Sequence, residues 1–215
     1  EPEHMSVLTG FTAGLLLITL SELGDKTFFI GALLAMRHPR RWVFVGVTAA
    51  LFTMTVLSVL LGQVAALMPL HYVKWAAVVL FIGGGAKLLY DAAAMGANDT
   101  LEAEQAAACA AIQQQAPVSS RRGLASAVVL RAFTLTFVAE WGDRTQLATL
   151  TLAATHSPLG VMVGATLGHA ICAAIAVVSG KWIAGKLSER WLTTMSGGLF
   201  LLFGVVAAFA LINGS

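Results

Sequence analysis

Long, continuously apolar runs separated by short polar segments dominate the chain. A helix needs about 20 mostly apolar residues to cross the hydrocarbon core of a bilayer. Six runs qualify, with approximate ends at residues 7–36, 42–67, 72–95, 124–155, 159–181 and 191–212. A transmembrane barrel would instead show short strands of alternating polarity. The pattern therefore predicts six transmembrane helices.

The first and fourth runs are longer than one straight crossing requires. Each is interrupted near its middle by charged residues and a glycine, at residues 22–27 and 140–145. We therefore expect both runs to form bent or broken helices inside the membrane.

Composition supports a membrane protein of one domain. Of the 215 residues, 58% are hydrophobic and 11% are charged, and the mean hydropathy is +0.81. Soluble domains carry about 25% charged residues, so an ordinary soluble enzyme and a disordered chain are both excluded. A net charge of +2 is too small to indicate a basic surface that binds nucleic acid. The lipid bilayer is the expected partner, and the sequence does not predict an oligomeric state.

Loop lysines and arginines set the orientation of a membrane protein, because they collect on the cytoplasmic side. If six spans alternate, only Lys74 falls on one side. Eight loop cations fall on the other side: Arg37, Arg40, Arg41, Arg121, Arg122, Lys181, Lys186 and Arg190. Both termini are therefore predicted to be non-cytoplasmic. The segment 96–123 is predicted to be a cytoplasmic linker in which residues 101–115 could form a helix.

The two halves of the chain repeat each other at an offset of 118 positions. The hexapeptide ELGDKT at 22–27 aligns with EWGDRT at 140–145, and Gly46 aligns with Gly164. The repeats cover residues 1–95 and 124–215, on either side of the linker 96–123. Each half has three predicted spans, and an odd number places the second half upside down in the membrane. Inverted repeats with interrupted helices are typical of secondary transporters.

The repeated hexapeptide carries the candidate chemistry. Each ionisable residue at membrane depth costs roughly 2.5–3.5 kcal/mol even on lenient scales. On a continuous helix, positions i, i+3 and i+4 share a face, so the charged residues of each motif are expected to project together. They are Glu22, Asp25 and Lys26 in the first motif, and Glu140, Asp143 and Arg144 in the second. A purely structural ion pair would explain one such cluster, but two repeated clusters favour a function.

Carboxylate and hydroxyl oxygens suit hard cations such as Mg²⁺, Ca²⁺ and Mn²⁺. The four acids, Glu22, Asp25, Glu140 and Asp143, are the predicted metal ligands. Four carboxylates and two basic side chains leave a charge of −2, which one divalent cation or two protons would neutralise. We therefore hypothesise exchange of one divalent cation for two protons, with no bound cofactor.

Other polar residues are candidates for supporting roles. Lys26 and Arg144 are expected to tune the acids, and Gly24 and Gly142 to allow a distortion or close helix approach. Thr27, Thr145 and Gln146 could be ligands or hydrogen-bond donors to ligands. His169 lies in the fifth span and is either a hydrogen-bonded core residue or a proton relay.

The doubled motif resembles that of the Gdt-type family of membrane cation transporters of the Golgi, chloroplasts and bacteria. The family's signature is two copies of Glu-x-Gly-Asp-(Lys/Arg)-(Thr/Ser), which residues 22–27 and 140–145 match at every position. The resemblance implies transport of Mn²⁺ or Ca²⁺ in exchange for protons. The short linker resembles the bacterial members, which implies manganese export across the inner membrane.

Three other functions fit parts of the pattern. A metal-dependent intramembrane hydrolase would use the acids with Arg144 as a phosphate clamp. A cation channel would use the acids as a selectivity filter. An amino-acid exporter of similar size is the third, although repeated acids suit a cation better than a zwitterion.

Overall fold

The computed structural model describes residues 2–94, 99–114, 124–183 and 189–212, and every regular element in these ranges is a helix. The nine helices of the described ranges are α1 (Pro2–Glu22), α2 (Lys26–Arg37), α3 (Arg40–Ala65), α4 (Leu70–Ala94), α5 (Asp99–Gln113), α6 (Leu124–Glu140), α7 (Arg144–Thr155), α8 (Pro158–Ile183) and α9 (Glu189–Ile212). Arg121, Arg122 and Lys186, used above for orientation, lie outside the described residues, as do residues 96–98 and 115–123 of the linker.

The helices agree with the predicted apolar runs. The helices α3, α4, α8 and α9 are each long and apolar enough to cross a bilayer. Together α1 and α2 are also long and apolar enough, with a bend of 65° between them, which confirms the predicted break in the first run. The fourth run forms α6 and α7, separated at the same motif position. Its crossing of the membrane, and with it the six-span count, stays a prediction.

Helix boundaries repeat along the chain as the sequence does. Lys26 and Arg144 begin α2 and α7, and Arg40 and Pro158 begin α3 and α8, each pair 118 positions apart. The packing is also paired, because α1 lies against α8 while its equivalent α6 lies against α3. In the same way α2 contacts α8, and α7 contacts α3. Equivalent helices of the two halves therefore make equivalent contacts with the opposite half.

Glycines allow the equivalent helix pairs to approach closely. Within lipid, helix association depends on tight packing of small residues, since lipid tails are as apolar as the side chains. A methyl group added at Gly46 of α3 would lie 2.5 Å from the Val129 carbonyl oxygen of α6. At the repeat-related Gly164 of α8, it would meet the Phe11 carbonyl oxygen of α1. These two repeat-related glycines therefore allow close contact between the two halves.

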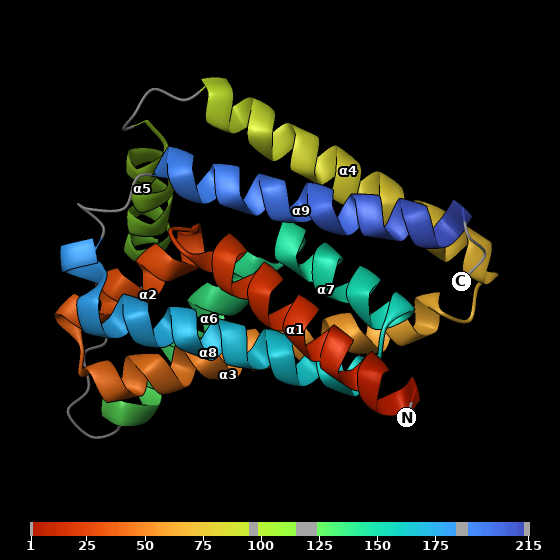
Figure 1. Ribbon diagram of the computed structural model, residues 1–215. Coiled ribbons are helices and arrows are strands. Elements are labelled where there is room, and N and C mark those ends of the chain that lie inside the picture. Colours follow the sequence, from red (N-terminus) through yellow and green to blue (C-terminus); the bar gives the residue numbers. More distant parts are fainter. Residues whose placement is uncertain (1, 95–98, 115–123, 184–188, 213–215) are drawn as a thin grey trace.

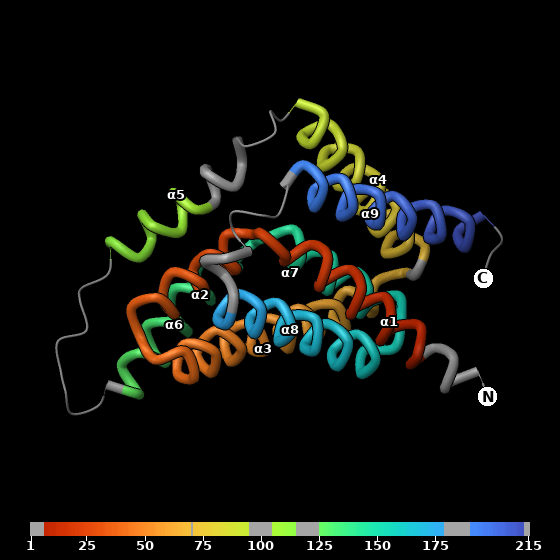
Figure 2. The backbone as a smooth tube through the Cα atoms, turned by 60° about the vertical axis from the view of Figure 1, so that its left-hand side comes forward, coloured from red at the N-terminus to blue at the C-terminus, as the bar shows by residue number. Residues whose placement is uncertain are grey.

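The helices α4 and α9 lie side by side as a separate layer across the other transmembrane helices (Figures 1 and 2). Small residues hold this pair together: a methyl group at Gly85 would lie 2.9 Å from the Gly197 carbonyl oxygen. The Ser196 hydroxyl of α9 donates to the Leu20 carbonyl of α1 at 2.9 Å, joining the layer to the rest. The start of α1 and the end of α9 lie at one end of the molecule, and α5 at the opposite end (Figures 1 and 2).

The helix α5, predicted within the linker, packs on α2. Ala108 and Ile112 are buried in an apolar cluster with residues of α2, α3, α6 and α8. The Arg131 guanidinium of α6 donates to the Ile112 carbonyl at 2.9 Å, close to the end of α5 where helix carbonyls lack partners. The linker helix is therefore a docked part of the fold.

Replacing Arg131 by methionine is expected to loosen the docking of α5. The substitution keeps an apolar stem but removes the donor, and a hydrogen bond from a charged group contributes about 1.5–3 kcal/mol. Amide hydrogen exchange at residues 108–112 should accelerate by about tenfold or more. Arg190→Met, on the exposed side of α9, is the matched control. Unchanged protection in Arg131→Met would show that apolar packing alone holds α5.

Candidate cation site

Each motif forms a break between two helices. Gly24 has φ +82° and Gly142 has φ +81°, a left-handed backbone conformation that glycine adopts at little cost. The Asp25 amide donates to the Glu22 carbonyl at 3.2 Å, and the Asp143 amide to the Glu140 carbonyl at 3.1 Å. Each chain segment therefore stops its first helix at the glutamate and begins a new helix just after the aspartate.

This geometry corrects one expectation. The residues of each motif do not share one helix face, because the left-handed glycine ends the helix between them. Glu22 belongs to α1 and Lys26 to α2, with Asp25 as the N-cap of α2. The relative positions of the acids are set by the turn and by the way the two halves pack.

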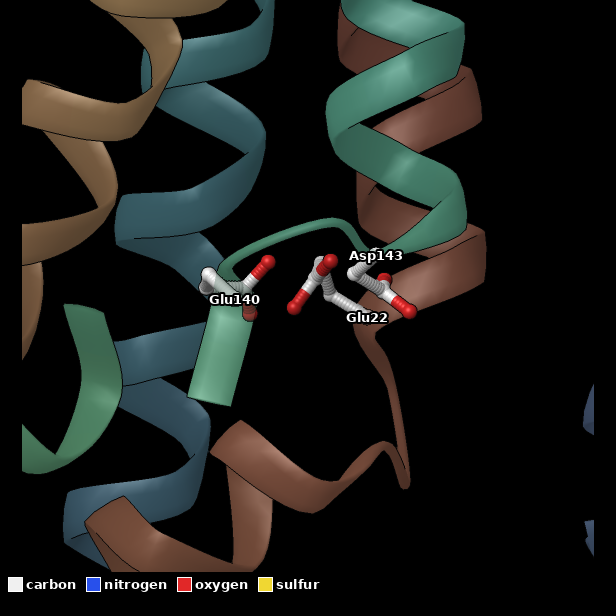
Figure 3. Close-up of side chains that lie close together, drawn as sticks. All are labelled: Glu22, Glu140 and Asp143. Carbon is white, nitrogen blue, oxygen red and sulfur yellow. The ribbon is translucent and has the colours of Figure 1, made fainter. Parts of the chain in front are cut away.

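Three acids converge between the two breaks. Carboxylate oxygens of Glu22, Glu140 and Asp143 all lie within 4.8 Å of one another. Figure 3 shows the three side chains side by side where α1 and α6 end. Each of the two glutamates is only 2% exposed, whereas Asp143 is half-buried. Three carboxylates this close cannot remain as bare anions away from water, so protons or a cation must accompany them.

Two threonines orient this cluster. The Thr27 hydroxyl donates to Glu22 Oε2 at 3.0 Å. The Thr145 hydroxyl lies 3.0 Å from Asp143 Oδ2 and 3.4 Å from Glu140 Oε2, and can donate to either. The Thr145 amide also donates to Asp143 Oδ2 at 3.3 Å, so this aspartate caps α7. Both threonines therefore fix one oxygen of a glutamate and leave the other oxygen available.

The remaining glutamate oxygens are buried without partners. Within the described part of the chain, Glu22 Oε1 and Glu140 Oε1 accept no hydrogen bond. Buried polar atoms in folded proteins almost always have a partner. Two such carboxylate oxygens in one cluster are suited to bind a hard cation.

Asp25 lies beside this cluster, outside the group of carboxylate oxygens within 4.8 Å of one another, and its charge acts on both glutamates. Its Oδ1 atom lies 3.2 Å from Nη2 of Arg144, which forms an ion pair between the first and second motifs. Lys26, at the position equivalent to Arg144, forms no ion pair with any described residue. The structure therefore brings together three of the four predicted ligands and pairs the fourth with a predicted tuning residue.

The other candidates lie around the cluster. Gln146 accepts a hydrogen bond from the Gly142 amide at 2.6 Å, which stabilises the turn. Trp141 is 65% exposed, with its ring 5.5 Å from that of Phe137. His169 is buried in α8 outside the carboxylate cluster, and its Nδ1 has no partner among the described residues. Ser196, which bonds to α1 close to Glu22, was not found from the sequence, because a lone serine in an apolar helix gives no signal.

Carboxylates gathered between broken helices of a duplicated helical membrane protein are an arrangement that suits a transporter of hard cations. The sequence profile described as "Divalent cation/proton antiporter GDT1" matches residues 10–96 and 128–214, one match in each half. The chain belongs to this family. It is a multi-pass membrane protein that exchanges a divalent cation for protons, and not an enzyme.

Proteins named as GDT1-like align with nearly the whole chain. A GDT1-like protein of the cyanobacterium Synechocystis is 53% identical over 203 residues, covering 94% of this chain and 97% of the relative. GDT1-like protein 3 of rice (Oryza sativa subsp. indica) is 41% identical over 202 residues, covering 92% of this chain and 72% of the relative. No solved structure matches the chain.

Proposed function

We propose that this protein exports Mn²⁺ from a bacterial cytoplasm in exchange for protons, through a site formed by Glu22, Glu140 and Asp143. The observation that carries the proposal is the cluster of three carboxylates within 4.8 Å, of which the two glutamates are buried. Within it, one oxygen of each glutamate has no partner among the described residues. Thr27 and Thr145 support the cluster by orienting the opposite carboxylate oxygens.

The choice of Mn²⁺ is supported by the donor set. The cluster offers carboxylate oxygens and no sulfur or imidazole, which disfavours soft metals. Ca²⁺ takes 6–8 oxygen ligands in flexible geometry, whereas three carboxylates form a more compact site. The resemblance to bacterial manganese exporters points the same way. Ca²⁺ is the second candidate ion.

Protons and the cation would compete for the same carboxylate oxygens. The four motif acids and two motif bases carry a net charge of −2, so two protons would replace one divalent cation without a change of charge. A neutral site is held in the low-dielectric membrane interior at the least cost while access changes from one side to the other. The inward proton gradient of a bacterial membrane would then drive the metal outward.

The orientation rests on the loop charges and on the repeat. Six spans with both termini non-cytoplasmic would place the linker helix α5 and the cationic loops in the cytoplasm. Three spans in each half, 1–95 and 124–215, would invert the second half relative to the first. The two halves would then rock about the carboxylate cluster to open it to either side.

Flux in proteoliposomes tests this function. Purified protein would be reconstituted with a pH gradient, and Mn²⁺ movement and internal pH would be followed together. We expect uphill Mn²⁺ movement with two protons moving the opposite way, and slower flux with Ca²⁺. Metal flux that ignores the pH gradient would indicate a channel, and a ratio of one proton per metal would contradict the charge argument. Faster flux with Ca²⁺ would reverse the assigned preference.

A further inference from the structure

The two motifs are equivalent in sequence but not in structure. Replacing each residue by its repeat equivalent, 118 positions away, converts the ion pair Asp25–Arg144 into Asp143–Lys26. The first pair is formed at 3.2 Å. The second is absent, because Asp143 lies in the carboxylate cluster and Lys26 has no ion-pair partner among the described residues. One aspartate therefore faces the cluster while its equivalent is held by a base from the other half.

The N-terminal capping of α2 and α7 also differs between the two motifs. Asp143 accepts a hydrogen bond from the Thr145 amide at the start of α7. Asp25 occupies the N-cap position of α2 but makes no side-chain capping bond. Within its own motif, Thr145 lies within hydrogen-bonding distance of both acids, whereas Thr27 donates to Glu22. The ion pair with Arg144 therefore accompanies the absence of the side-chain capping bond that the equivalent aspartate makes.

The surroundings of the two glycine turns show the same asymmetry. A methyl group added at Gly24 would lie 3.1 Å from Leu192 Cδ1 of α9. At Gly142, no atom lies within 4 Å of that position. Gly24 is buried and Gly142 is exposed, and the neighbouring Leu23 is half-buried where Trp141 is exposed. The first break is therefore covered and the second is open.

We propose that Lys26 and Arg144 are alternating positioning residues that select which aspartate joins the two glutamates. In the conformation of the structure, Arg144 holds Asp25 aside while Asp143 faces Glu22 and Glu140. In the opposite state, Lys26 holds Asp143 aside and Asp25 takes its place, supported by Thr27. This inference rests on the proposed exchange between two states, and it specifies the contact that distinguishes them.

The physical basis is the duplication itself. Two halves of the same sequence pattern can exchange conformations at small cost, because each contact that breaks is replaced by its equivalent in the other half. The cluster keeps three carboxylates in both states, so the site retains its charge. The exchange is not symmetric in energy, since the planar guanidinium pairs with a carboxylate more strongly than an ammonium does. The state in which Arg144 pairs with Asp25 is therefore the more stable of the two.

Cysteine labelling at the two breaks tests the exchange. Cys109→Ser and Cys172→Ala would remove the native thiols, and Leu23→Cys or Trp141→Cys would supply one reporter at repeat-related positions. A small methanethiosulfonate reagent would be applied to metal-free protein, and the labelling rate at each reporter would be measured in the presence of each charge variant.

Opposite shifts are expected for the two bases. Arg144→Gln should raise labelling at position 23 and lower it at position 141, each by about tenfold, because a partly buried charged hydrogen bond is lost from one state only. Lys26→Gln should have the opposite effect at position 23 and lower its labelling rate below that of the protein with both bases intact. The conservative Arg144→Lys should bring the two labelling rates closer together, since it makes the two motifs alike. If Lys26 and Arg144 had only a structural role, replacing them would not shift the labelling rates in opposite directions.

Several outcomes would overturn the exchange. They are shifts of the same sign in Arg144→Gln and Lys26→Gln, no shift in either, or an unchanged ratio in Arg144→Lys. If a glutamine variant does not remain monodisperse in detergent, Arg144→Lys alone still decides the question. Labelling requires no transport, so failure of proton-coupled Mn²⁺ flux would refute the proposed function and leave this readout intact. Normal antiport without the labelling shifts would refute the exchange alone.

Discussion

Glu140→Gln is expected to abolish proton-coupled metal transport, with a loss of about 100-fold or more in initial rate. The amide keeps the volume of the side chain but removes one of three negative charges that would hold the cation. Loss of a residue that merely supports a metal ligand costs about 10–100-fold in affinity or activity, and Glu140 would contact the ion directly. Glu22→Gln should have the same effect, because both glutamates present an unpartnered buried oxygen.

The matched control is Asp91→Asn, a carboxylate-to-amide change on α4 outside the cluster. It should retain transport. Mn²⁺ titration of detergent-solubilised protein would separate binding from translocation, and size-exclusion chromatography would show that the variants remain folded. Asp143→Asn should weaken Mn²⁺ binding more than Asp25→Asn, since only Asp143 lies in the described cluster. Full transport by Glu140→Gln would place the cation elsewhere.

The sequence was a good guide to the helices and to the breaks at which the motif acids gather. Lipid demands continuous helices of fixed length, so the apolar runs predicted α3, α4, α8 and α9 to within a few residues. The interruption at residues 22–27 predicted the bend between α1 and α2. Acids at membrane depth are costly enough that two such clusters in one chain indicated function.

The internal geometry of the site could not be read from the motif. Spacing on a continuous helix placed the acids of each motif on one face, but Gly24 and Gly142 adopt left-handed conformations that end the helices. The pair Asp25–Arg144 joins residues 119 positions apart. It depends on how the halves pack, and no local pattern encodes it.

The same holds for contacts that involve single residues in apolar helices. Ser196 bonds to α1, and Arg131 bonds to the linker helix α5, yet neither residue has an equivalent signal in the repeat. The linker's alanine-rich composition predicted a helix, but only the packed structure shows that Ala108 and Ile112 dock it on the core. Sequence periodicity reports which positions are apolar, and the partner of each position comes from tertiary packing.

Gly164→Ala is expected to destabilise the protein by about 1–3 kcal/mol, the usual cost of overpacking an interior, and Gly164→Leu to prevent correct assembly. An added methyl group would overlap the Phe11 carbonyl oxygen and lie 3.0 Å from the Leu15 amide nitrogen. These are backbone atoms, which cannot rotate away, so α1 would have to move as a whole. Since α1 ends at Glu22, its displacement would also disturb the carboxylate cluster and reduce transport.

The duplication supplies a matched set of variants for this test. Gly46→Ala should behave like Gly164→Ala, because its methyl group would lie 2.5 Å from the Val129 carbonyl oxygen and 2.7 Å from Ala132 Cβ. Gly83→Ala and Gly198→Ala should be neutral or stabilising, since nothing lies within 4 Å of either position and alanine favours the helix by about 0.8–1 kcal/mol. Thermal unfolding in detergent would rank the four variants. Equal melting temperatures across the set would mean that the contacts between α1 and α8 and between α3 and α6 adjust freely, and that close packing of these helices does not fix the position of Glu22 or Glu140.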